Sequence, residues 1–402
     1  MKRVGPGTIA WVAIALLSRC AVIAGHSQAT ALDQRQQAIA LEQQGKITEA
    51  EIAWRTVLET QPGSAEAFAH LGFLESRQEH YAQAASLYRK ALTLNPAMPG
   101  LRMNLGLALF KAGELKDALR IFEELVKKEP SSSAEAQRLT ILIGMSHYGL
   151  KDYAAAVPYL RRATASDPQN LPFRLILAHS CLWSKQYQCV LDTYHQILLL
   201  NAESAEADML AGEALDEMQD HDGAIEQFRA AVRANPKEPN VHFGLGYLLW
   251  TKGRYEEAAQ EFQAELTNIP NHAQAIVYLA DCQIKLNDPK AALSLLERAI
   301  RINPNMELAH LDLAAVYEDS TRRDDALREL KTAARLSPND VRVHYRLARL
   351  YQAMGRKEDA SIEFEKTKTL TKAADASVFG ELNKTRTNSN PTEKVRGAVV
   401  DK

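Results

Sequence analysis

Proline recurs along this chain in a fixed register of 34 residues. Steps of 34 separate Pro62, Pro96 and Pro130, and Pro168 follows after four additional residues. From Pro168 the register continues without a further shift through Pro236, Pro270, Pro304 and Pro338, with Ala202 in the slot between Pro168 and Pro236. A period of this length is typical of a supersecondary unit that stacks on copies of itself, because one unit cannot bury its own apolar face. The 402 residues are therefore predicted to form one long array rather than several unrelated domains.

Small residues repeat in phase with the prolines at two further positions. One set lies twelve residues before the proline slot: Ala50, Ala84, Ala118, Ala156, Val190, Ala224, Ala258, Ala292, Ala326 and Ala360. The other lies a further twelve residues upstream: Ala38, Gly72, Gly106, Gly144, Ala178, Gly212, Gly246, Ala280, Ala314 and Ala348. Small residues let two helices cross closely, and turn signals such as Lys252-Gly253-Arg254 separate those helices. Since proline lacks the amide donor and ends a helix, each unit is predicted to be a helical hairpin.

Large side chains follow the second small residue by four positions, as at Tyr88, Phe122 and Phe228. On these residues the chain resembles the tetratricopeptide repeat family, with its clearest unit at 65–98. The resemblance implies an all-α fold, a right-handed α-solenoid of about ten hairpins whose first helices line the concave side. The array is expected over 32–374, with units near 31–64, 65–98, 99–132, 137–170, 171–204, 205–238, 239–272, 273–306, 307–340 and 341–374. The four extra residues around 131–136 predict an elongated turn after the third unit.

The first 31 residues differ in composition from the array. Lys2 and Arg3 precede an uncharged, largely apolar run at 8–17, and small residues follow it. This order of segments is that of a secretory signal peptide. Cleavage is expected after Ala24, Ala29 or Ala31. We therefore expect residues 1–31 to direct export to the periplasm or the extracellular space. The alternative is an uncleaved N-terminal anchor in the inner membrane with the repeats outside the cytoplasm, and membrane contact is expected through that anchor alone.

The period fails after the tenth unit. Residues 371–380 are predicted to form a short capping helix, which an exposed last repeat needs. Residues 381–402 are polar and offer little apolar surface to bury, so they are predicted to be disordered. Together 375–402 are expected to be a short cap and a polar tail.

Net charge and motifs argue against catalysis and against nucleic-acid binding. The formal net charge is −2, so no overall field attracts polyanions. The sequence lacks the zinc-protease, phosphate-loop, nucleophile-elbow and dinucleotide-binding motifs. We therefore expect no enzyme activity, no cofactor, no metal site and no nucleic-acid partner. The sequence does not specify an oligomeric state.

The densest group of cysteines and histidines is His179, Cys181, Cys189 and His195. The repeat register places His179 and His195 on opposite faces, which argues against a tetrahedral zinc site. Cys181 is expected near the end of a first helix and Cys189 near the start of the second. Two alternatives remain for the cysteines: a disulfide between Cys181 and Cys189, which an exported protein can form, or two buried free thiols.

In the family that this chain resembles, the second, fifth, ninth, twelfth and thirteenth residues of each first helix face the groove. Units three to five then present Met103, Leu107, Phe110, Met145, Tyr148, Leu175, His179, Leu182 and Trp183. Unit six contributes Met209, Glu213, Asp216 and Glu217, and unit seven contributes Phe243, Tyr247 and Trp250. The tenth unit is basic, with Arg342, Arg346 and Arg349.

Apolar and aromatic side chains gathered in a concavity favour contact with a partner. The resulting hypothesis is a non-catalytic scaffold or adaptor of the cell envelope that binds protein or peptide segments, the acidic residues selecting segments with Lys or Arg. The alternative is a polysaccharide-export or envelope-assembly subunit that stacks sugars on Trp183, Tyr247 and Trp250. Capture of a C-terminal carboxylate is not expected, because Asn104 is the one groove asparagine that matches the co-chaperone clamp.

Overall fold

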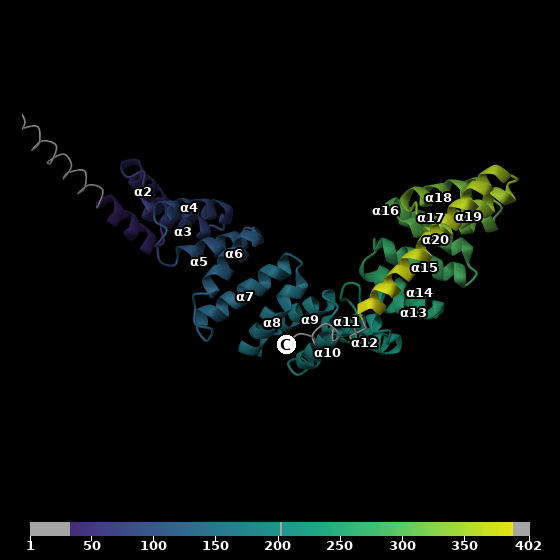
Figure 1. Ribbon diagram of the computed structural model, residues 1–402, viewed down its shortest axis with the longest axis horizontal. Helices are drawn as coiled ribbons and strands as arrows, with labels where there is room; N and C mark the ends of the chain where they lie inside the picture. Colours follow the sequence, from purple (N-terminus) through teal and green to yellow (C-terminus); the bar gives the residue numbers. More distant parts are fainter. Residues whose placement is uncertain (1–32, 202, 389–402) are drawn as a thin grey trace, which may run out of the picture. The chain divides into compact units, whose positions relative to one another are not determined.

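The computed structural model describes residues 33–201 and 203–388 of the chain (Figure 1). Helices follow one another through both ranges, and no strand occurs among the residues described. The predicted all-α solenoid of hairpins is thereby confirmed. The chain divides into two compact units at Leu200 and Asn201. We call residues up to 200 the N-terminal unit and residues from 201 the C-terminal unit, and each is described by itself.

In the N-terminal unit, each first helix packs against the second helix that follows it. The first helices are 33–43, α3 (Ala65–Arg77), α5 (Leu101–Lys111), α7 (Ala134–Gly149) and α9 (Leu171–Trp183). The second helices are α2 (Ile47–Thr60), α4 (Tyr81–Leu94), α6 (Leu115–Val126), α8 (Tyr153–Ser166) and α10 (Tyr187–Leu198). The extra residues before α7 form a connection that ends at Ser133, whose hydroxyl oxygen accepts from the Ala136 N–H at 3.0 Å. A serine cap of this kind starts a helix efficiently.

The C-terminal unit repeats the same alternation. Its first helices are α11 (Ala205–Glu217), α13 (Val241–Thr251), α15 (Ala273–Lys285), α17 (Glu307–Asp319) and α19 (Val341–Ala353). Its second helices are α12 (His221–Ala234), α14 (Tyr255–Asn268), α16 (Pro289–Ile302), α18 (Arg323–Leu336) and α20 (Lys357–Asn388). One continuous apolar core runs from Ala224 to Ala360 through these hairpins.

Glycine at the first small position lets a large ring of the second helix lie against the backbone of the first. A Cβ atom built on Gly72 would come within 2.7 Å of Tyr88, and one on Gly246 within 2.9 Å of Phe262. Both rings are buried, so neither can move aside without opening the core. The spacing of small and large residues in the sequence therefore sets the distance between the paired helices.

Helices α5 and α13 begin at the same place in the repeat, after a residue with a left-handed backbone. Gly100 has a φ of 70° and Asn240 a φ of 66°. The carboxylate of Glu265, which is fully buried, accepts from the backbone N–H of Asn240 at 3.2 Å and of Phe243 at 3.1 Å. Leu125 holds the corresponding position in unit three. A carboxylate from α14 thus binds the free N–H groups at the start of α13, whereas α5 has no side-chain cap.

A histidine near the start of α17 ties the preceding proline turn to the second helix. The ring nitrogens of His310 face the Glu329 carboxylate at 2.7 Å and the Pro304 carbonyl at 3.0 Å. Both partners are acceptors, so the imidazolium satisfies them best, and the Glu329 carboxylate raises the pKa of His310. His344 makes the same pair of contacts in the next unit, with Glu363 at 2.6 Å. These contacts recur with the repeat because the residues recur with it.

The end of the array differs from the prediction. Helix α20 continues to Asn388, through residues 371–380, which were expected to form a short capping helix, and into 381–388, which were expected to be disordered. Ala373, Ala374 and Ala376 favour helix, and no proline interrupts the chain from 371 until Pro391. The rest of the predicted tail, 389–402, lies outside the described residues.

The predicted signal peptide or anchor, residues 1–31, also lies outside the described residues. Across the part of the chain that is described, no helix is both long enough and apolar enough to cross a membrane.

Candidate binding surfaces on the first helices

Three aromatic side chains form a surface around the end of α9 in the N-terminal unit. Trp183 is 64% exposed, which is unusual for so large a side chain. Its ring stacks on Tyr153 with centroids 6.0 Å apart, and Tyr153 meets the edge of Tyr148 at 5.8 Å. We call Tyr148, Tyr153 and Trp183 the Trp183 surface. Sequence reasoning missed Tyr153, because it opens the second helix of its unit and the groove register counts only first-helix positions.

The other predicted contact residues of the N-terminal unit lie deeper. Leu182 is 8% exposed and belongs to the core, so its assignment to the groove is corrected. It continues a buried stripe with Ala178 and Cys181, at the spacing that keeps residues on one helix face. Half-buried positions are found for Met103, Leu107, Phe110, Met145, Leu175 and His179. The first three of these pack against the core of their unit, which leaves Trp183 as the main exposed ring.

The structure joins Cys181 and Cys189 in a disulfide, with their Cα atoms 5.8 Å apart. The bond links the end of α9 to the start of α10 across a turn in which Lys185 has a φ of 59°. Cys282 of the C-terminal unit is buried, and that burial raises the pKa of its thiol to about 12. A thiol with so high a pKa is unreactive at neutral pH, which suits a core residue.

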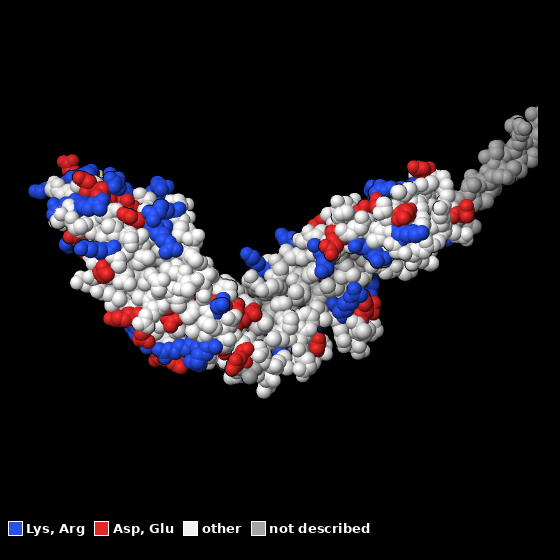
Figure 2. All heavy atoms as spheres, turned by 180° about the vertical axis from the view of Figure 1, so that it is seen from behind, with Lys and Arg blue, Asp and Glu red and all other residues white. Residues whose placement is uncertain are grey.

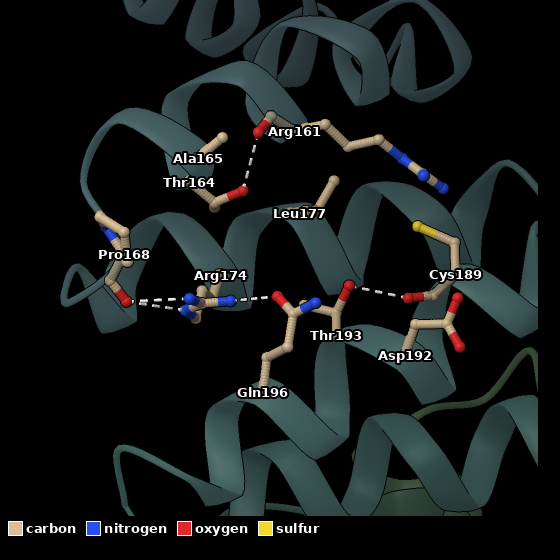
Figure 3. Close-up of a pocket in the computed structure, with 10 residues that line it drawn as sticks. All are labelled: Arg161, Thr164, Ala165, Pro168, Arg174, Leu177, Cys189, Asp192, Thr193 and Gln196. Atoms are coloured by element: carbon tan, nitrogen blue, oxygen red, sulfur yellow. Dashed lines mark hydrogen bonds between the residues drawn. The ribbon is translucent and has the colours of Figure 1, made fainter.

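A cavity of about 460 Å³ lies between α8 and α10 beside this disulfide (Figure 3). The buried Arg174 lines it and donates from Nε and Nη2 to the Pro168 carbonyl at 3.1 and 2.9 Å, and from Nη1 to Gln196. Arg161 extends along the upper edge toward Cys189. Because the donors of Arg174 already have protein partners, this arginine holds the turn before α9 in place. No feature of the sequence pattern indicated this cavity.

The C-terminal unit contains a larger aromatic cluster, built from three successive helices. Trp250 of α13 meets Tyr278 of α15 at 5.0 Å, and Tyr247 lies 6.0 Å from Trp250 and 5.5 Å from Tyr278. Phe243 and Phe262 extend the cluster toward the core, at 6.0 and 5.7 Å from Tyr278. Tyr247 is 37% exposed, and the other rings are half-buried or buried. Tyr278 was not predicted, because it holds the sixth position of its helix rather than a groove position.

Two buried carboxyl groups border this cluster. Asp281 is 7% exposed, and its Oδ2 accepts from the Trp250 indole N–H at 2.6 Å. Asp312 of α17 is 8% exposed, and its Oδ2 has no hydrogen-bond partner. Burial and the neighbouring Asp281 charge raise the pKa of Asp312 to about 8. Neither aspartate was predicted to be part of a site, because from the sequence alone an aspartate in a first helix is expected to be exposed to solvent.

The predicted charged positions are exposed or ion-paired. Glu213 and Glu217 are exposed, Met209 is half-buried, and Asp216 faces the His221 ring at 2.7 Å. In the tenth unit Arg342 pairs with Asp340 at 2.6 Å, and the Asp340 carboxylate raises the pKa of Arg342. Arg346 donates to the Leu311 carbonyl at 2.9 Å and to Glu318 at 3.1 Å, and Arg349 is exposed.

Charges of both signs are interspersed over the face shown in Figure 2, with uncharged areas between them. No single sign of charge dominates this face. Among the described residues, no group of three or more His, Cys, Asp or Glu side chains is arranged to hold a metal ion.

The chain belongs to the tetratricopeptide repeat family. Two sequence models of the tetratricopeptide repeat match it, one at 35–99, 191–239 and 209–273, the other at 77–140, 147–214, 249–316 and 318–368. Proteins of this family generally act as non-catalytic scaffolds that mediate protein or peptide binding. The family does not by itself name a partner.

Several curated proteins are similar to part of this chain. The DnaJ protein P58IPK homolog A of Oryza sativa subsp. japonica is 25% identical over 264 residues, which cover 61% of this chain and 50% of that protein. The BBSome complex member BBS4 of Bos taurus is 24% identical over 221 residues, covering 54% and 41%. The chain thus spans about half the length of the curated relatives that it matches.

Among solved structures, the APC/C hetero-tetramer Cut9–Hcn1 is similar with a TM-score of 0.47 and 16% identity, over 78% of this chain and 74% of that one. YrrB, described as a tetratricopeptide protein with an unusual peptide-binding site, is similar with a TM-score of 0.38 and 19% identity. That likeness covers 47% of this chain and 97% of YrrB.

Proposed function

We propose that this chain is an exported, non-catalytic scaffold of the cell envelope that binds segments of partner proteins on its first helices. The observation that carries the proposal is the Trp183 surface, where a tryptophan that is 64% exposed stacks on Tyr153, which in turn contacts Tyr148. An exposed aromatic ring held by other rings loses little freedom when a partner covers it, and such residues supply much of the affinity of protein interfaces.

Two features support export. Residues 1–31 have the order of segments of a signal peptide, with the anchored form as the alternative. The Cys181–Cys189 disulfide is suited to an oxidising compartment, since cytosolic thiols are kept reduced. Fusion of residues 1–40 to a reporter that is active only outside the cytoplasm tests the proposal, and a reporter that stays inactive would contradict it.

Partner binding is tested by capture of proteins from an envelope extract of the host on the purified chain. Trp183→Ala should weaken the saturable retention of a partner by at least about tenfold. Ile52→Ala is the matched control, because Ile52 is 62% exposed but lies on the second helix α2. Equal retention by wild type and Trp183→Ala would refute binding at this surface. Retention of an envelope polysaccharide with no protein would favour the glycan-binding alternative.

A further inference from the structure

The C-terminal unit holds a second recognition site of a different chemical character. Its components are the Tyr247, Trp250 and Tyr278 rings and the carboxyl groups of Asp281 and Asp312, which we call the Asp281–Asp312 site. We propose that this site binds the side-chain ammonium group of a lysine carried by a partner segment. The inference rests on the proposed function, because it names the chemistry of a segment that the scaffold binds.

The unsatisfied carboxyl oxygen of Asp312 is the first argument. A buried acceptor without a donor is costly, and native structures leave few of them. The charges of Arg346 and Arg342 of α19 and of Lys285 of α15 lower the pKa of Asp312, and none of these groups bonds to its Oδ2. Arg342 and Arg346 are already bound to other groups, so they cannot turn to Asp312 without leaving those partners.

The second argument is the convergence of the two carboxyl groups on one ring. Helix α15, which carries Tyr278 and Asp281, packs against α17, which carries Asp312. Burial raises the pKa of Tyr278, and the charges of Asp281 and Asp312 raise it further. Asp281 is fixed by its bond from the Trp250 indole at 2.6 Å. An ammonium group that bonds to both aspartates would therefore meet one positioned carboxylate and one whose Oδ2 lacks a donor.

These properties select a lysine rather than an anion or a neutral amide. An ammonium group has three donors and no acceptor, so it can serve both carboxyl groups at once. Its positive charge is attracted to aromatic faces, and the apolar stem of lysine can lie along the partly exposed Tyr247. The exposed Glu213 and Glu217 of α11, in the same unit, add negative charge that favours a basic segment.

The test uses the full-length chain and synthetic peptides of known sequence. An array of acetylated 12-residue peptides with Leu or Phe at helical spacing carries Lys, Arg, norleucine or Glu at one central position. Norleucine keeps the apolar stem of lysine and lacks its charge. Affinities of the strongest binders are then measured in solution by calorimetry. The wild type should prefer lysine over norleucine by at least about tenfold, which corresponds to one buried charged contact.

Two isosteric variants test whether the preference for lysine over norleucine comes from Asp281 and Asp312. Asp312→Asn and Asp281→Asn should each remove most of the tenfold preference for lysine and leave norleucine binding unchanged. Asp319→Asn is the control, because Asp319 carries the same charge at the exposed end of the same helix, α17. Since Asp312 must lose its proton to pair with an ammonium group, wild-type affinity for the lysine peptide should also rise between pH 6 and pH 9.

The outcomes separate this inference from the proposed function. Equal binding of lysine and norleucine peptides by the wild type would overturn the lysine site while the scaffold role stands. A lysine preference that survives both aspartate substitutions would overturn it as well. A preference for the glutamate peptide would assign the surface to acidic partners instead, and failure to bind any peptide would count against both proposals.

Discussion

Each compact unit places a tryptophan near the end of a first helix, and the two tryptophans have different surroundings. Trp183 is the last residue of α9 and is 64% exposed, resting on Tyr153. Trp250 lies one position earlier in the repeat register, is half-buried, and donates to Asp281 of the next first helix. A shift of one residue turns a helix position by about 100°, which is enough to move a ring from solvent to a neighbouring helix.

The difference shows that one kind of residue serves two purposes in the same repeat. The tryptophan without a polar anchor keeps most of its surface exposed, whereas the anchored one joins two successive hairpins through its bond to Asp281. Substitutions that act differently on stability and on binding can therefore separate the two units.

The largest effect is expected from the tryptophans themselves. Trp250→Ala removes a ring from a packed cluster and leaves the buried Asp281 without its donor, so it should lower the free energy of unfolding by about 3–4 kcal/mol. Trp183→Ala should lower it by less than about 1 kcal/mol, because the ring is mostly in water. Urea denaturation followed by circular dichroism measures both. Similar losses for the two variants would show that exposure does not separate their roles.

A second comparison concerns the starts of α13 and α5. Glu265→Ala should destabilise the C-terminal unit by about 3 kcal/mol, because two N–H groups at the start of α13 lose their buried acceptor. Glu265→Gln keeps an acceptor and should cost about half as much. Leu125→Ala, at the corresponding position of unit three, removes packing but no cap. In Leu125→Ala the backbone amides of 100–104 should therefore exchange their hydrogens more slowly than the amides of 240–244 do in Glu265→Ala. Unchanged exchange at 240–244 would rule out the capping role.

The two units also differ in their cysteines, because the N-terminal unit contains the Cys181–Cys189 disulfide. Reduction, or the pair Cys181→Ser and Cys189→Ser, should lower the stability of the N-terminal unit by about 2–3 kcal/mol through the lost constraint on an eight-residue separation. The C-terminal unit, whose Cys282 is a buried free thiol, should be unaffected. Limited proteolysis with and without reductant reports on each unit. Faster cleavage beyond residue 201 after reduction would argue against a local effect.

The smallest effect is a dependence on pH. The pKa of Asp312, about 8, lies above that of an unfolded aspartate, near 3.9. Its contribution to stability is therefore complete below about pH 4 and is lost as pH rises through about 8. The raised pKa of His310 acts in the same direction above its ordinary value of 6.5.

Asp312→Asn removes the part of the pH dependence of stability that comes from the titration of Asp312. The variant should be more stable than the wild type by about 2 kcal/mol at pH 9, with little difference at pH 4. Thermal denaturation across this range measures the effect, and Asp319→Asn again serves as the control. A wild type and an Asp312→Asn variant with parallel pH profiles would contradict the raised pKa of Asp312.

The residues predicted for the site were only partly those that the structure brings together. Phe243, Tyr247 and Trp250 were identified, and they do gather in one cluster. Leu182 was placed in the groove but is core. Tyr153, Tyr278 and Asp312 were missed, because the register of groove positions describes one helix at a time and these residues act through neighbouring helices.

The sequence by itself determined the hairpins, their order and the family to which the chain belongs. It could do so because the small residues, the large rings and the prolines act within one unit and recur in every unit. Only the tertiary structure decided which tryptophan is covered, where Asp281 finds its donor and why Asp312 has none. Those features join residues of different units, such as Trp250 and Asp281, which are 31 positions apart. The repeated pattern specifies contacts within each unit. It does not specify contacts between residues that differ from unit to unit and meet where two neighbouring units pack.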